Sequence, residues 1–316
     1  MSSKELALEA NQLVKRYSSS TSIGPVSLTV QKGATFGFLG PNGSGKTTTI
    51  RMMLGLIRPE GGSAKIFGID PANNPKEALS RVGYAPELPT FQTFFTAEQL
   101  LNFTAGLYGI DGGARGKKVR ELLQVVGISD HSQKKIGKFS KGMVQRLAVA
   151  QALINDPELV MMDEPTIGMD PAATIYFRDL FKNIHSQGKT IFVSSHLLDE
   201  VQRLCTHVGM IYRGRMVFQG SISEILARFG TDMTIEAELR ELTPSILEHL
   251  KKLHYVQDLS THMNKILITV KDGEDFRSEL AEEIIKGGGK LVGLSLRKVT
   301  LEDVFIETLR RGAQHE

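Results

Sequence analysis

One stretch of eight residues combines glycines, a lysine and a threonine at a spacing that suits phosphate binding. It fits the pattern G-x-x-x-x-G-K-[ST] and lies between an apolar run and a helix-forming run. Its glycines let successive backbone N–H groups point inward, and the start of the next helix adds its positive end. Lys46 would reach the β- and γ-phosphates of a nucleotide, and Thr47 offers Mg²⁺ a hard oxygen ligand. The predicted phosphate-binding residues are Gly40, Pro41, Asn42, Gly43, Ser44, Gly45, Lys46, Thr47 and Thr48.

Two carboxylates follow a fully apolar run. Asp163 and Glu164 come directly after 159–162, a run that is typical of a buried parallel strand. Open α/β sheets bind their ligands beyond the carboxyl ends of such strands. We therefore expect Asp163 to hold Mg²⁺ through a water, and Glu164 to orient or deprotonate an attacking water.

Two further residues have both a structural and a functional interpretation. His196 follows the predicted strand 190–194, where a histidine is more often structural. Its position one strand after Asp163 and Glu164 favours a contact with the γ-phosphate and the attacking water. Asp170 could cap the following helix, take part in the site, or do both.

The composition is that of a soluble globular protein with about two domains. The chain has 316 residues, 41% hydrophobic and 23% charged, with a net charge of +3. The basic excess is spread along the chain, so it gives no argument for nucleic-acid binding. No apolar run approaches the ~18 residues of a membrane span, and the N-terminus lacks a signal core. We expect a cytosolic chain whose membrane role, if any, needs another subunit. Cys205 is the only cysteine, which excludes a disulfide framework.

The predicted elements divide into an α/β domain, residues 1–229, and a smaller α+β domain, residues 230–316. Within the first, about residues 90–156 are predicted to be helical, with caps at Thr96 and Ser140. The second has the order strand, helix, strand, strand, helix, strand of a ferredoxin-like unit. It carries no catalytic cluster, and we expect it to serve in docking or in stabilising a dimer.

A set of motifs resembles the ATP-binding subunit of ABC transporters over about residues 4–225. The segment Phe139-Ser140-Lys141-Gly142-Met143 stands where that family has its signature, commonly Leu-Ser-Gly-Gly-Gln. Ser140 and Gly142 match the signature, and the other three residues depart from it. The hydroxyl, the close backbone approach and the helix N-terminus are the features that would grip a γ-phosphate. The resemblance implies a P-loop NTPase core of ABC type with antiparallel β and helical subdomains.

The same resemblance assigns a role to each matched position. It implies that ATP is sandwiched in a head-to-tail homodimer, with Ser140 and Gly142 facing the nucleotide of the other subunit. It makes Glu164 the catalytic base, Asp170 the dimer-interface aspartate and His196 the switch histidine. Tyr17 becomes the adenine-stacking residue, although from its place at the end of a strand it could equally be a half-buried packing residue.

One departure concerns the metal. Where the family often has glutamine after a Tyr-x-Pro turn, this chain has Glu87. A carboxylate can still ligate Mg²⁺, but it adds negative charge near the γ-phosphate. The predicted metal ligands are Thr47, Asp163 and Glu87.

The signature variant, the Pro-Glu turn and the segment 300–305 resemble one branch of the family, the exporter ATPases that act with a separate six-helix permease. This implies a chain bound to the inner face of the cell membrane through that permease. Phe91, Phe94 and Phe95 are candidates for the permease contact, and could equally be core residues.

Other classes fit less well. A translational GTPase would carry an Asn-Lys-x-Asp motif, and Asn264-Lys265-Ile266-Leu267 lacks the aspartate. Small-molecule kinases lack the Ser140 helix together with the Asp-Glu strand end. The alternative that we keep is an ABC-type ATPase acting on ribosomes or nucleic acid. Against it, the chain has one phosphate loop and no cysteine between Lys46 and Ser140.

Overall fold

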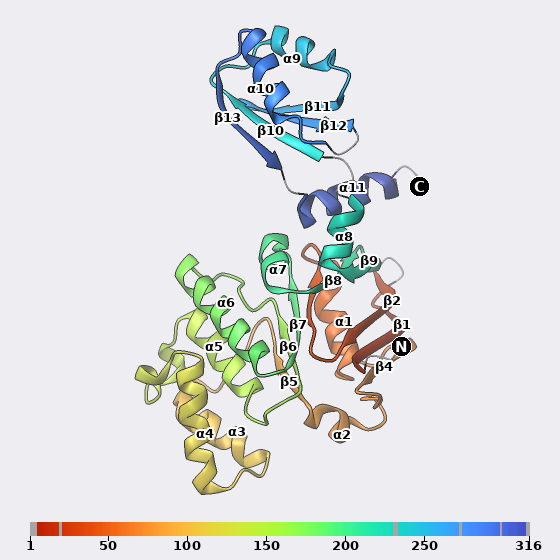
Figure 1. Cartoon of the computed structure of the whole chain (residues 1–316). Coiled ribbons are helices and arrows are strands. Elements are labelled where there is room, and N and C mark those ends of the chain that lie inside the picture. The colour runs from red at the N-terminus through yellow and green to blue at the C-terminus, as the bar shows by residue number, and fades with distance from the viewer. Residues whose placement is uncertain (1–4, 19–20, 230–232, 272–273, 298, 314–316) are drawn as a thin grey trace. The chain divides into compact units, whose positions relative to one another are not determined.

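In the computed structural model the chain forms two compact units, Met1–Ser221 and Ile222–Glu316 (Figure 1). The structure describes all residues except 1–4, 19–20, 230–232, 272–273, 298 and 314–316. The two units are described separately below.

The first unit is built on a six-stranded sheet in the order β5-β6-β7-β3-β8-β9. Its inner strands β3, β6 and β7 are buried along their whole length, as their apolar sequences predict. All neighbours are parallel except β8 and β9. The strands are β3 (Thr35–Leu39), β5 (Val82–Ala85), β6 (Leu159–Asp163), β7 (Thr190–Ser195), β8 (His207–Tyr212) and β9 (Arg215–Ser221).

The second sheet of this unit is a three-stranded antiparallel sheet in the order β2-β1-β4. Helix α1 (Lys46–Met53) contributes Ile50, Met52 and Met53 to one apolar core with residues of both sheets. The strands are β1 (Leu6–Arg16), β2 (Ser22–Gln31) and β4 (Gly61–Ile66). Three more helices of this unit are α2 (Pro75–Ser80), α6 (Pro171–Ser186) and α7 (Leu198–Leu204).

The predicted helical subdomain consists of α3 (Ala97–Leu107), α4 (Gly112–Val125) and α5 (Lys141–Ala152). Both predicted caps are confirmed: Thr96 and Gln99 form a capping box, and the Ser140 side chain accepts from Met143 N. Helix α4 begins at Gly112, and the Arg115 side chain in its first turn donates to the carbonyl of Ile110.

The second unit has the predicted ferredoxin-like order, with a sheet arranged β11-β12-β10-β13. All strand pairs are antiparallel, and α9 and α10 pack on one face of the sheet. Its elements are α8 (Ile222–Phe229), β10 (Met233–Leu239), α9 (Pro244–Lys251), β11 (Val256–His262), β12 (Lys265–Val270), α10 (Arg277–Lys286), β13 (Leu291–Arg297) and α11 (Leu301–Ala313).

Helix α8 packs against α11 and so lies in the second unit. The boundary between the compact units, between Ser221 and Ile222, therefore lies one helix earlier in the chain than the expected boundary at 229/230. The folding of residues 1–229 as a separate domain stays a prediction. Within the described residues, none of the helices is both long and apolar enough to cross a membrane.

Candidate functional site

The phosphate loop runs from the end of β3 to the first turn of α1, and two of its glycines are required by the fold. Gly45 has a φ of 104°, in the left-handed region, and a Cβ there would lie 2.6 Å from Ile23 Cδ1. A Cβ on Gly40 would lie 2.4 Å from the carbonyl oxygen of Ile211. The loop therefore packs its backbone too closely against its neighbours for side chains at these positions.

Lys46 lies inside the loop and is 6% exposed. Its Nζ donates to the carbonyl oxygens of Gly40, at 2.6 Å, and Pro41, at 3.1 Å. It also lies 3.0 Å from Oε1 of Glu164. The structure thus joins the predicted phosphate lysine to the predicted general base.

Glu164, directly after strand β6, contacts His196, directly after strand β7. Its Oε2 is 2.8 Å from His196 Nδ1, and its side chain is 5% exposed. Its φ of 46° places a non-glycine residue in the left-handed region, a strained conformation that functional sites often hold. A carboxylate with two bound cationic or polar partners still has lone pairs with which to accept a proton.

Asp163 ends strand β6 and is fully buried. Its Oδ1 accepts a hydrogen bond from Ser194 Oγ at 2.5 Å, whereas Oδ2 has no hydrogen-bond partner among the described residues. The Ser194 hydroxyl also accepts from the backbone N–H of Glu164 at 3.0 Å. One buried carboxylate oxygen is therefore available to a ligand, which fits a hard cation or its bound water.

A cavity of about 310 Å³ opens over the loop and brings the adenine and metal candidates together. Tyr17 and Glu87 line it, as do Thr47 and Glu164, whereas Asp163 and His196 do not. Tyr17 is 56% exposed and its hydroxyl lies 3.4 Å from Thr48 Oγ1. This exposure disfavours a packing role, and adenine stacking stays a prediction. The remaining lining residues are Thr21, Ile23, Asn42, Gly43, Gly45, Lys46 and Thr48.

Ser140, Gly142 and Asp170 do not line this cavity. Ser140 caps α5, and Asp170 caps α6 by accepting from Ala173 N at 2.8 Å. A Cβ on Gly142 would meet nothing within 4 Å, so the chain's own packing does not require glycine there. The side chain of Lys141 extends to Gly168, in the loop that precedes Asp170. A Cβ added to Gly168 would lie 2.6 Å from the Nζ of Lys141.

Two site residues were not predicted from the sequence. Ser194 bonds to both Asp163 and Glu164, and Gln145, 4% exposed, donates to the carbonyl of Pro86 beside Glu87. A buried serine directly after the apolar run Ile191-Phe192-Val193 is a signal for Ser194. Gln145 has no comparable local signal, because helices commonly carry glutamine.

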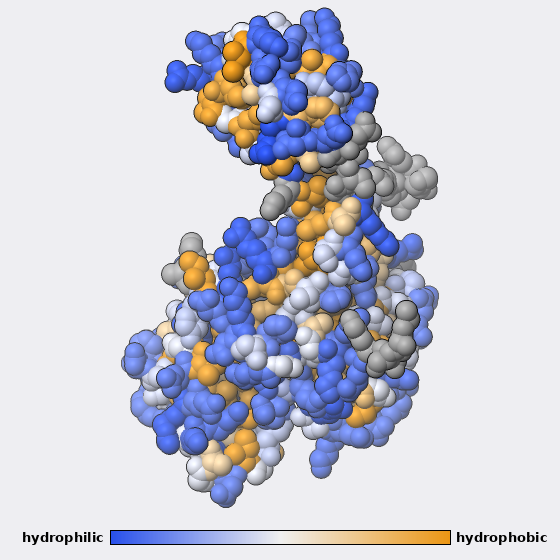
Figure 2. All heavy atoms as spheres, viewed as in Figure 1, coloured by the Kyte–Doolittle hydropathy of each residue, from blue (hydrophilic) through white to orange (hydrophobic). Residues whose placement is uncertain are grey.

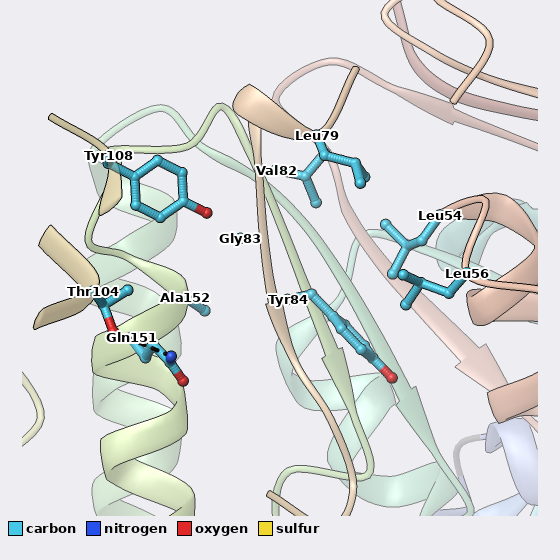
Figure 3. Close-up of a pocket in the computed structure, with 10 residues that line it drawn as sticks. All are labelled: Leu54, Leu56, Leu79, Val82, Gly83, Tyr84, Thr104, Tyr108, Gln151 and Ala152. Carbon is cyan, nitrogen blue, oxygen red and sulfur yellow. Dashed lines mark hydrogen bonds between the residues drawn. The ribbon is translucent and has the colours of Figure 1, made fainter. Parts of the chain in front are cut away.

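A second groove, of about 270 Å³, follows strand β5 at the edge of the six-stranded sheet (Figure 3). In Figure 3, Tyr84 and Tyr108 stand on opposite sides of Gly83, and Gln151 donates to Thr104. Burial, with the charge of Asp163 as a smaller cause, raises the pKa of Tyr84 to about 12, so its hydroxyl stays protonated. The other lining residues are Leu54, Leu56, Leu79, Val82 and Ala152, and none of the ten is charged.

Helix α3 and its flanking residues carry exposed apolar side chains, of which Tyr108 lines the groove. We refer to Phe94, Phe103, Leu107 and Tyr108 as the α3 strip. They are 61%, 58%, 72% and 50% exposed. The rings of Phe94 and Phe95 are 4.7 Å apart, and those of Phe95 and Phe103 are 6.4 Å apart. Hydrophobic surface is visible over this region in Figure 2. Phe91 and Phe95 are half-buried and Phe94 is exposed, so Phe94 is not a core residue.

A phosphate loop after β3, with an acidic strand end at β6 and a histidine after β7, defines a P-loop nucleotide-binding protein. Residues 23–167 match the family model described as ABC transporter. Residues 220–309 match the model of the ATP-binding protein DrrA1-3-like C-terminal domain.

Two curated relatives match this sequence over almost the whole length of the chain. The bacitracin transport ATP-binding protein BcrA of Bacillus licheniformis is 35% identical over 310 residues, 96% of this chain and 98% of that protein. The linearmycin resistance ATP-binding protein LnrL of Bacillus subtilis is 31% identical, over 96% of this chain and 98% of that protein. A solved ATP-binding subunit of an ABC transporter has a TM-score of 0.65 at 28% identity, covering 71% of this chain and 93% of that one. The chain belongs to the ABC transporter family, as an ATP-binding and ATP-hydrolysing subunit.

Proposed function

We propose that this subunit uses Mg²⁺-dependent ATP hydrolysis to drive export of a substrate through a separate membrane permease. The observation that carries the proposal is the buried contact of Glu164 with both Lys46 and His196 at the edge of the sheet. This contact supports a site in which Lys46 would bind phosphate, Glu164 would act as the base and His196 would orient the water.

Glu164 would take the proton of the attacking water, and His196 would hold that water through the ring nitrogen not used by Glu164. Lys46 would exchange its carbonyl partners for phosphate oxygens. Ser194 would keep Asp163 and the backbone of Glu164 in place.

Three residues of this region carry oxygen donors suited to Mg²⁺. Thr47 and Glu87 line the cavity, and Oδ2 of Asp163 has no hydrogen-bond partner among the described residues. These are the hard oxygens that would hold the ion. Bound Mg²⁺ would supply charge stabilisation at the phosphates. Glu87 makes this set more acidic than the usual glutamine would.

The proposed homodimer depends on three residues that do not line the cavity. Ser140 and Gly142 lie at the exposed start of α5, and Asp170 caps α6. In the proposed head-to-tail homodimer, these residues would complete the nucleotide site of the other copy.

The permease is the proposed occupant of the groove along β5. Its uncharged lining and the exposed α3 strip suit an apolar segment of a partner better than a charged surface. Export is supported by the relatives, whose names refer to bacitracin transport and linearmycin resistance. The chain would then lie on the inner face of the membrane.

The test combines turnover with identification of the partner. Tagged Glu164→Gln protein, loaded with Mg-ATP, is purified from detergent-solubilised native membranes, and its turnover is measured separately. We expect turnover to fall by ~10²-fold or more, as loss of a general base implies, with a multi-span membrane protein in the eluate. Glu248→Gln, at an exposed position of α9, is the matched control and should hydrolyse ATP normally.

Two results would contradict the proposal. Near-normal turnover in Glu164→Gln would remove that residue from the role of base. Ribosomes or nucleic acid in the eluate, without a membrane protein, would favour the soluble ABC ATPase instead.

A further inference from the structure

Strand β13 forms one edge of the ferredoxin-like sheet. It pairs with β10 on one side, and no described strand pairs with it on the other. Residues Gly293–Arg297 pair with Glu238–Thr234 in regular register, after a register shift at the start of the strand. A straight stretch of backbone N–H and C=O groups is therefore available along this edge.

The two edges of the sheet differ in how they are protected. The opposite edge, β11, carries Asp258 and His262, which discourage pairing with another strand. Strand β13 carries no charge from Leu291 to Leu296, and Val292 and Leu296 are 58% and 36% exposed. An uncharged edge with apolar exposed side chains favours addition of another strand.

We propose that β13 pairs antiparallel with β13 of a second copy of this chain, about a twofold axis at Ser295. This register sets Leu294 opposite Leu296 of the second copy and Ser295 opposite itself. It sets Gly293 opposite Arg297, so that no like charges face each other. A Cβ on Gly293 would meet nothing within 4 Å, so the approach to this position is open.

A second copy fits this edge because the strand is complementary to itself, as a twofold interface requires. The contact is small and would be weak between free chains. It would gain strength wherever two copies are held together, since linked contacts raise the effective concentration. The pairing of two β13 strands goes beyond the proposed function, because it needs neither nucleotide nor permease.

The first test is cysteine crosslinking of the full chain without nucleotide. Burial raises the pKa of the Cys205 thiol, so the native cysteine contributes little reaction. Under mild oxidation, Ser295→Cys should form disulfide-linked dimers at least about tenfold faster than Ser260→Cys. Ser260 is the matched control, an exposed serine on the opposite edge strand β11. Equal rates would overturn the proposal.

The second test is a charge exchange at the proposed twofold axis. Ser295→Lys and Ser295→Glu each place like charges opposite one another, and should each weaken self-association by about fivefold in sedimentation velocity. An equimolar mixture should restore it through the heterodimer. Because Ser295 is exposed, both variants should keep the native thermal midpoint. Failure of the mixture to restore association would contradict the pairing.

The outcomes separate this inference from the proposed function. Both tests are run without ATP, and also in Lys46→Ala protein, so a failure of ATP hydrolysis leaves them unaffected. In native membranes, crosslinks from Ser295→Cys that reach only the permease would assign this edge to that partner and overturn the pairing of two copies.

Discussion

At the residue scale, Lys46 and Glu164 form a buried ion pair whose members depend on each other for stability. Their side chains are 6% and 5% exposed, and removal of one leaves the other charge buried. We expect Lys46→Ala to weaken ATP binding by ~10–100-fold, because charge-assisted bonds to phosphate are lost. It should also lower the free energy of unfolding, because among the described residues the Glu164 carboxylate then keeps His196 as its one side-chain partner.

A double-mutant cycle checks this dependence. In Lys46→Ala/Glu164→Gln, the buried charge is gone, so part of the lost stability should return, with a coupling of ~1–3 kcal/mol. Urea unfolding of the nucleotide-free protein measures it. Additive losses would show that the pair contributes nothing to the fold beyond its separate members.

At the element scale, the α3 strip should bind the permease without taking part in hydrolysis. Leu107 is 72% exposed, so Leu107→Asp should fold normally, yet it places a charge on an apolar docking surface. We expect permease recovery to fall by about tenfold or more, with basal ATP turnover unchanged. Gln124→Asp is the matched control, because both positions are exposed in the last turn of a helix. Equal recovery of permease by the two variants would remove α3 from the docking surface.

Elements were predictable where a local pattern identifies them. The apolar runs of β3 and β6 and the caps at Thr96 and Ser140 are visible in short stretches of sequence. The contact of Ser194 with Asp163 depends on the pairing of β6 with β7 in one register, which no single stretch contains. The contact of Gln145 with Pro86 likewise joins a helix to a turn 59 residues earlier.

At the scale of the whole molecule, the chain has separate hydrophobic cores. Among the described residues, one core draws on residues from Leu8 to Met216, and another on residues from Met233 to Leu294. Helix α8 joins neither of these clusters. Its Ile222 and Ile225 are 8% and 7% exposed, and it packs against α11, whose Leu301 and Val304 are fully buried.

This arrangement predicts different behaviour for two truncations. A chain ending at Ser221 should stay soluble and bind ATP as the full chain does, because its core is intact. A chain ending at Phe229 keeps α8 without α11 and exposes two isoleucines, each worth ~1.5–3 kcal/mol when buried. It should aggregate at a lower temperature, measured by light scattering during heating. The reverse order would place α8 in the ATP-binding domain, at the boundary that the sequence predicts.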